Sequence, residues 1–202
     1  MQTDIPLKRL TMLRAADLLP LLGVPHATLL AVETLELPAS NARLDNILHV
    51  RSPSGLEYLH LIEWQGYPDQ GVLWRVLGYL AWIGRHNPTK TVVGTLVYLT
   101  PPCDMGDTLT QAVDGEVFHS CRIPCVRLWQ QDATAALATN RPGMAVLSPL
   151  MRGATRELVE QAARLVMEQT ALPQQSDLLS VLGVFAEPMM TYERFVRFVG
   201  KE

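Results

Sequence analysis

The stretch from Ala42 to Gln65 constrains the fold more than any other part of the chain. It contains an alternating segment, ARLDNILHV, a break at RSPSG, and a second segment, LEYLHLIEWQ. Serine, proline and glycine are typical turn residues, so we expect the chain to reverse near Pro53 or Ser54. The pattern therefore predicts a β-hairpin made of these two segments.

The two-residue period of a strand indicates which side chains of this hairpin share a face. Successive side chains point to opposite faces, so Glu63 and Gln65 lie on one face of the second strand. A turn centred at Pro53 or Ser54 places Asp45 opposite Leu61 or Glu63, respectively. Directly opposite Cβ atoms are about 4.5–5.5 Å apart. Two carboxylates that close repel each other, so the sequence predicts either a metal ion or a proton between them.

Two interpretations of these acids stay open at this point. Strand carboxylates are usually solvated, and an aspartate followed by an ExQ spacing occurs by chance in many sheets. However, Glu63 ends a very apolar strand, where an unpaired charge is costly. Glu33 and Glu36 belong to the preceding apolar segment and could add a carboxylate to the site, although a solvated side chain is the simpler explanation for each.

Composition narrows the class of protein. The chain has 202 residues, of which 48% are hydrophobic and 18% charged, and this fits one globular domain. No apolar run reaches the roughly 18 residues of a membrane span, and Met1–Leu10 lacks a signal-peptide core, so we expect a cytoplasmic protein with no membrane contact. Three cysteines without a CxxC pair indicate reduced thiols. A net charge of -3 gives no global signature of nucleic-acid binding.

The rest of the chain predicts an α/β fold. A strand at 28–37, a helix at about 70–85 with Asp69 as its N-cap, and an apolar strand at 91–100 surround the hairpin. Strand, helix and strand in this order imply a right-handed crossover and a parallel pair. The other predicted elements are a helix at 10–22, strands at 117–122 and 124–129, a helical turn within 130–142, an apolar segment at 145–150, and helices at 155–170, 178–185 and 192–199.

The order of these elements resembles the PD-(D/E)XK nuclease superfamily, and more narrowly its Rpn/YhgA-like group of bacterial recombination-promoting nucleases and transposase-like proteins. The segments that carry the resemblance are LDNILHV (44–50), LHLIEWQ (59–65), WRVLGYLAWIGRH (74–86), VVGTLVYL (92–99) and VRLW (126–129). The resemblance implies a restriction-endonuclease-like core of order αβββαβ, with a mixed central sheet flanked by helices. It also implies a single domain over 1–202, with its core at about 10–130 and a helical C-terminal part at about 150–202.

The resemblance further implies a Mg²⁺-dependent DNA endonuclease, for which Mn²⁺ could substitute. Asp45 and Glu63 would bind the metal together with the backbone carbonyl of Trp64, because Mg²⁺ prefers oxygen ligands. Gln65 would lie beside the scissile phosphate, where classical members have lysine. Arg75 would be an auxiliary residue of the following helix.

Tyr79 on the same helix, Glu33 and Glu36 are the remaining auxiliary candidates. DNA is the expected partner, and a homodimer would provide two sites for cutting both strands of a duplex. Because the Gln65 amide carries no positive charge and takes no proton near neutral pH, a second hypothesis stays open. The chain would then be a nuclease-fold domain that binds DNA or protein without efficient catalysis.

Overall fold

The computed structural model of the chain describes residues 4–36 and 43–200, and it leaves the side chains at 4, 34–36 and 43–45 undescribed. Contacts between residues group the chain into two compact units. One unit is Leu19–Arg127, and the other joins Met1–Leu18 to Leu128–Glu202. The fold is α/β.

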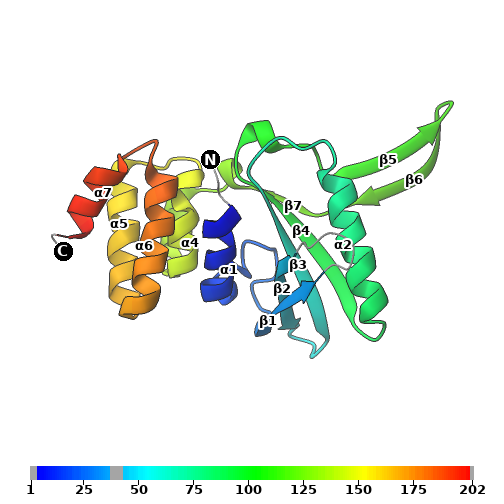
Figure 1. Cartoon of the computed structure of the whole chain (residues 1–202), viewed down its shortest axis with the longest axis horizontal. Coiled ribbons are helices and arrows are strands. Elements are labelled where there is room, and N and C mark those ends of the chain that lie inside the picture. The colour runs from blue at the N-terminus through cyan, green and yellow to red at the C-terminus, as the bar shows by residue number, and fades with distance from the viewer. Residues whose placement is uncertain (1–3, 37–42, 201–202) are drawn as a thin grey trace. The chain divides into compact units, whose positions relative to one another are not determined.

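A mixed five-stranded sheet forms the first unit, in the spatial order β1-β2-β3-β4-β7 (Figure 1). Strands β1, β2 and β3 pair antiparallel, whereas β4 is parallel to β3 and β7 is parallel to β4. The strand bounds are β1 (Thr28–Glu36), β2 (Arg43–Arg51), β3 (Glu57–Gln65), β4 (Thr91–Tyr98) and β7 (Cys125–Arg127).

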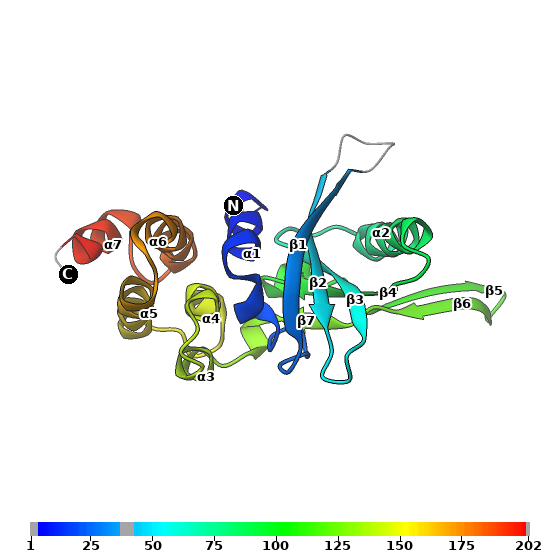
Figure 2. The same cartoon turned by 90° about the horizontal axis from the view of Figure 1, so that it is seen from below.

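Helix α2 (Val72–His86) connects β3 to β4 and lies along the face of these two strands (Figure 2). It buries Val72, Val76 and Ile83, which recur at helical spacing. Gly94 of β4 allows close packing, since a Cβ atom there would come within 3.0 Å of the Leu80 side chain. This packing fixes the position of α2 along the sheet.

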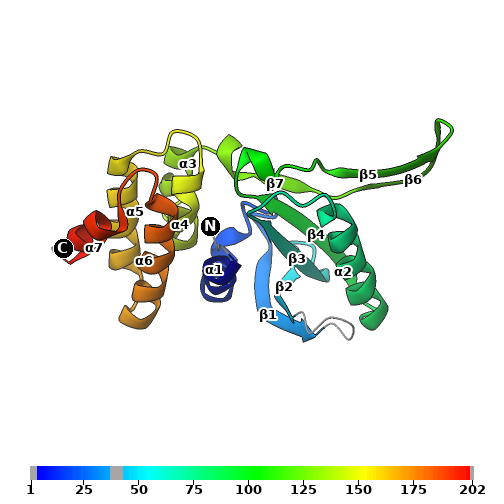
Figure 3. The same cartoon turned by 45° about the horizontal axis from the view of Figure 1, so that its top comes forward.

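A two-stranded hairpin follows β4 and the short 3-10 helix η1 (Pro101–Cys103). It consists of β5 (Thr108–Val113) and β6 (Glu116–Arg122), and Figure 3 shows it extending away from the five-stranded sheet. Asp114 and Gly115 form its turn with φ angles of 51° and 86°. Positive φ at both central residues is the geometry that the Asp-Gly dipeptide favours in tight hairpins. We call β5, the turn and β6 the arm.

The second unit is helical. Helix α4 packs against α1, α5 and α6, so the N-terminal helix is joined to the C-terminal part of the chain. At this contact the Gly143 amide donates a 2.9 Å hydrogen bond to Oδ2 of Asp17. The elements are α1 (Asp4–Leu18), η2 (Leu128–Gln130), α3 (Ala133–Ala138), α4 (Pro142–Leu147), η3 (Ser148–Leu150), α5 (Arg156–Gln169), α6 (Leu172–Ala186) and α7 (Tyr192–Val199).

The coarse prediction of an α/β fold with a mixed sheet and a parallel β3–β4 pair is confirmed. Three local predictions differ. Helix α1 begins at Asp4 and ends at Leu18 instead of spanning 10–22, and turns follow it up to Gly23. Strand β5 was not expected, and α6 begins at Leu172 rather than at 178.

Within the part of the chain that the structure describes, no helix is both long and apolar enough to cross a membrane.

Candidate functional site

The register of the β2–β3 hairpin is the one that the turn residues predict. Ile47 pairs with Leu61 and Arg51 with Glu57, so the chain reverses at Ser54. The turn is closed by the Gly55 amide, which donates a 3.0 Å hydrogen bond to the Ser52 carbonyl. Continued towards the far end of the hairpin, this register leads to positions 45 and 63. These are the next positions on the same face beyond Ile47 and Leu61.

Asp45 belongs to strand β2, and its side chain lies outside the described residues. The side chain of Glu36 lies outside them as well. The predicted roles of both as site residues therefore stay predictions.

Glu63 is held by Arg75 of helix α2. Its Oε1 atom accepts hydrogen bonds from Arg75 Nε at 3.1 Å and from Arg75 Nη2 at 3.0 Å. The two side chains are only 16% and 26% exposed, so this ion pair is partly shielded from water. A shielded pair of this kind is stronger and less sensitive to salt than a surface pair.

Gln65 is fully buried and both ends of its amide are engaged. Its Oε1 accepts a 2.7 Å hydrogen bond from Arg75 Nη2, and its Nε2 donates to the backbone carbonyl of Tyr67. Gln65 therefore helps to fix the guanidinium of Arg75. In this arrangement its amide does not face solvent, where a phosphate would have to bind.

Asp69 completes the set of partners around Arg75. Its Oδ2 accepts from Arg75 Nη1, and its Oδ1 accepts a 2.8 Å hydrogen bond from the Gly71 amide. The prediction that Asp69 is the N-cap of α2 is wrong, because Gly71 holds that position. We call Glu63, Gln65, Asp69 and Arg75 the Arg75 cluster.

Arg75 and Asp69 of the Arg75 cluster are charged at neutral pH. Burial lowers the pKa of Arg75, but the carboxylates of Glu63 and Asp69 outweigh that effect and raise it. The Gly71 amide and Arg75 lower the pKa of Asp69 below its ordinary value. Burial raises the pKa of Tyr79, and the negative charge of Glu63 raises it further. Tyr79 is thus a neutral hydroxyl next to a fixed group of charges.

The other predicted site residues lie elsewhere on the sheet or stay untested. The Glu33 carboxylate of β1 lies 3.5 Å from His49 Nδ1 and forms an ion pair with Lys90 Nζ at 3.9 Å. Trp64 is buried in β3, where its Cα atom pairs with Val97 of β4. The role of its carbonyl as a metal ligand stays a prediction.

Sequence reasoning missed the connection between Asp69 and Arg75. One signal could have revealed it. Arg75 lies one residue before the buried Val76, on the part of an amphipathic helix that approaches the sheet. A cation in that position needs anionic partners, and Asp69 and Glu63 are the nearest acids on the preceding loop and strand.

The donor atoms proposed for a metal have the right chemistry for Mg²⁺, which favours carboxylate and carbonyl oxygens. Among the described residues, no group of three or more His, Cys, Asp or Glu side chains could hold a metal ion. A site would therefore combine the Glu63 carboxylate, which Arg75 already contacts, with Asp45 and a main-chain carbonyl.

Comparison of the chain with family models, with curated proteins and with solved structures found no match in any of the three.

Proposed function

We propose that the chain is a Mg²⁺-dependent DNA endonuclease of the PD-(D/E)XK type, with Asp45 and Glu63 as its metal ligands. The observation that carries this proposal is the register of the hairpin. Continued by one same-face position from the Ile47–Leu61 pair, it leads to Asp45 on β2 and Glu63 on β3. Two acids at facing positions of a sheet are a suitable pair for one hard divalent cation.

The order of the elements supports the same proposal. The chain runs α1, β1, β2, β3, α2, β4, with three antiparallel strands followed by a parallel fourth. This is the αβββαβ order expected for the nuclease core. The parallel crossover through α2 delivers Arg75 to the end of β3 that carries Glu63.

In the proposed reaction, a bound Mg²⁺ would supply a water of lowered pKa and neutralise charge that builds on the phosphate. The side chains of the chain itself hold the site in shape. Arg75 orients the Glu63 carboxylate through two hydrogen bonds, and Gln65 and Asp69 prevent the guanidinium from turning. Gln65 is therefore a positioning residue in this proposal and does not contact the phosphate.

Arg75 also supplies a positive charge near the place where classical members have lysine. A preorganised cation stabilises charge that develops in the transition state, and it costs little reorganisation because its partners already fix it. Unlike lysine, a guanidinium does not give up its proton, so Arg75 acts electrostatically and not as a general base.

The test is plasmid nicking by the full chain with Mg²⁺ or Mn²⁺. We expect cleavage by the wild type, and rates at the level of a metal-free blank for Asp45→Asn and Glu63→Gln. Glu57→Gln is the matched control, because Glu57 lies on the same strand and pairs with Arg51 at the other end of the hairpin. Cleavage that survives both substitutions would contradict the proposal.

A second function is favoured by the contacts of the Arg75 cluster. The Glu63 carboxylate is engaged by Arg75, and the Gln65 amide is buried. These two observations fit a domain that keeps the nuclease fold for binding DNA or protein without hydrolysis. This second function predicts that the wild type does not nick the plasmid. It also predicts that the wild type and Asp45→Asn bind DNA equally well.

A further inference from the structure

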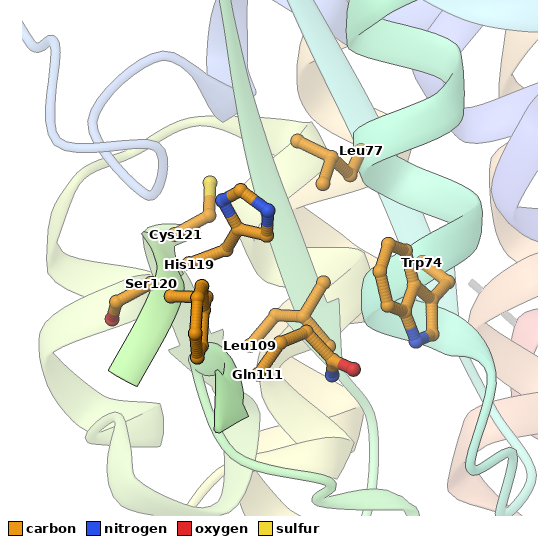
Figure 4. A pocket seen from close by; sticks show the side chains of 8 residues that line it. Trp74, Leu77, Leu109, Gln111, His119, Ser120 and Cys121 are labelled. Carbon is orange, nitrogen blue, oxygen red and sulfur yellow. The ribbon is translucent and has the colours of Figure 1, made fainter. Parts of the chain in front are cut away.

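A groove of about 540 Å³ separates the arm from the first half of helix α2 (Figure 4). Trp74 and Leu77 line it from the helix, and side chains of β5 and β6 line it from the opposite side. From the arm these include Leu109, Phe118, His119 and Cys121. The groove is mostly apolar and belongs to neither the Arg75 cluster nor the hairpin site.

Large apolar side chains are exposed along this part of the molecule. Trp74 is 53% exposed and Phe118 is 60% exposed, and both line the groove. Val113 and Val117, at the tip of the arm, are 61% and 57% exposed. Single exposed apolar residues are common, but a contiguous set beside a groove usually indicates a contact surface.

A β-bulge directs Phe118 towards the groove. Gln111 pairs with His119, whereas the next residue, Ala112, pairs with Val117, so Phe118 is the extra residue of β6. A bulge places two successive side chains on nearly the same side of a strand and changes their direction. Phe118 and His119 consequently both line the groove instead of alternating across the arm.

The arm has few of the packing partners that usually stabilise a β-hairpin, although β5 contacts the neighbouring helix α2. It is a two-stranded sheet, and nearly all of its residues are exposed on both faces. An isolated two-stranded hairpin is marginally stable in water, and its two outer edges offer unpaired backbone groups. An additional packing partner would bury the apolar side chains of the arm.

Charge and length indicate which partner fits. The tip carries the exposed acids Asp114 and Glu116, while the last turn of α2 carries the exposed bases Arg85 and His86. The acidic tip disfavours DNA, whose phosphates it would repel. The 15 residues of α2 span about 22 Å, and strands of six and seven residues span about 20 Å, so an arm matches the helix in length.

We propose that the groove between α2 and the arm receives the arm of a second copy of this chain, so that two copies exchange arms in a symmetric dimer. In this arrangement Phe118 of one copy packs on Trp74 of the other, and the acidic tip lies near the partner's Arg85. A two-fold axis makes the contact reciprocal, because each copy offers both an arm and a groove. The proposal does not depend on nuclease activity.

Sedimentation velocity of the full chain, measured over a wide range of concentration, tests this dimer. We expect a dimer for the wild type and a monomer for Phe118→Asp. Thr110→Asp is the matched control, since Thr110 is exposed on the same arm and alternates with the groove-lining Leu109 and Gln111. A wild type that stays monomeric at every concentration would overturn the proposal, and so would a Phe118→Asp variant that stays dimeric.

A charge exchange distinguishes a lost interface from a damaged arm. Arg85→Glu and Glu116→Lys should each shift the equilibrium towards monomer, and the double variant should recover the dimer. Circular dichroism must show the same helix and strand content in all variants. Failure of the double variant to associate more strongly than either single variant would contradict the assigned partner.

Discussion

The Arg75 cluster and the arm belong to the same unit of the molecule but are stabilised in opposite ways. In the Arg75 cluster every partner of the guanidinium is at most about one-quarter exposed, and four hydrogen bonds connect the four side chains. In the arm, most side chains are exposed, and the principal contacts are the ladder between β5 and β6 and the turn.

Because of this difference, we expect substitutions in the two regions to change different properties of the protein. Substitutions around β3 should act on the free energy of unfolding, because they change buried contacts. Substitutions on the arm should act on the dimer and leave the fold of one copy nearly unchanged.

Truncation of a buried side chain of strand β3 should have the largest effect on the free energy of unfolding. Ile62 of β3 is fully buried, so Ile62→Ala should lower the free energy of unfolding by roughly 2–5 kcal/mol through lost burial and a cavity. Val117→Ala on the arm should change it by less than about 0.5 kcal/mol when measured on the monomer. Urea denaturation at low protein concentration measures both. Equal losses would mean that the arm is part of the folding core.

Acid should destabilise the protein through His60. This residue is 3% exposed, its Nε2 shares a 2.8 Å hydrogen bond with the Thr95 hydroxyl, and burial lowers its pKa from 6.5 to about 4. Between these two pH values the unfolded chain binds a proton that the folded chain does not. Stability should therefore be complete above pH 6.5 and fall as the pH decreases, by up to about 3 kcal/mol near pH 4.

Replacement of His60 checks this dependence. His60→Gln should flatten the loss of stability between pH 6.5 and pH 4. Thermal unfolding across this range of pH is the measurement. An unaltered slope in His60→Gln would contradict the assignment to this buried imidazole.

Removal of the Arg75 guanidinium should lower the free energy of unfolding by a somewhat smaller amount. Arg75→Ala leaves the carboxylates of Glu63 and Asp69 and the amide of Gln65 without their shared donor. Since the two carboxylates are only partly shielded from water, we expect a loss of about 2 kcal/mol. Arg75→Lys keeps the charge but lacks the planar guanidinium with its several N–H donors, so it should recover only part of that loss. Full recovery by lysine would show that the geometry of the guanidinium is unimportant.

The smallest expected effects are those of alanine substitutions at two glycines, Gly115 and Gly78. Gly115 has a φ angle of 86° in the turn of the arm, so Gly115→Ala should destabilise the arm by about 1 kcal/mol. Gly78 lies on the exposed side of α2 with open space around it, so Gly78→Ala should stabilise the helix by up to about 1 kcal/mol. Opposite signs for the same chemical change would support the backbone assignment at both positions.

The sequence predicted those parts of the fold where burial produces a regular pattern. The hairpin register could be inferred because Ser52 to Gly55 mark the turn and the strands beside it are apolar. The buried strand β4 and the helix α2 were predicted within two residues at each end. In both cases the local pattern and the tertiary packing favour the same structure.

The parts that were missed depend on contacts that local patterns do not contain. Strand β5, with the sequence TLTQAV, is mostly exposed, so no face of it has to be apolar. The role of Gln65 depends on Arg75, ten residues further on, and on the angle at which α2 crosses the sheet. Asp69 was assigned to the N-cap because aspartate favours that position, but Gly71 is the N-cap, and Asp69 accepts hydrogen bonds from Arg75 and from the Gly71 amide.

The most direct test of the proposed metal site is a crystal of the wild type soaked in Mn²⁺. We expect an anomalous peak between the carboxylates of Asp45 and Glu63, within coordination distance of both. No peak at this place, with Arg75 still hydrogen-bonded to Glu63, would contradict the metal site and leave the Arg75 cluster as a structural ion pair.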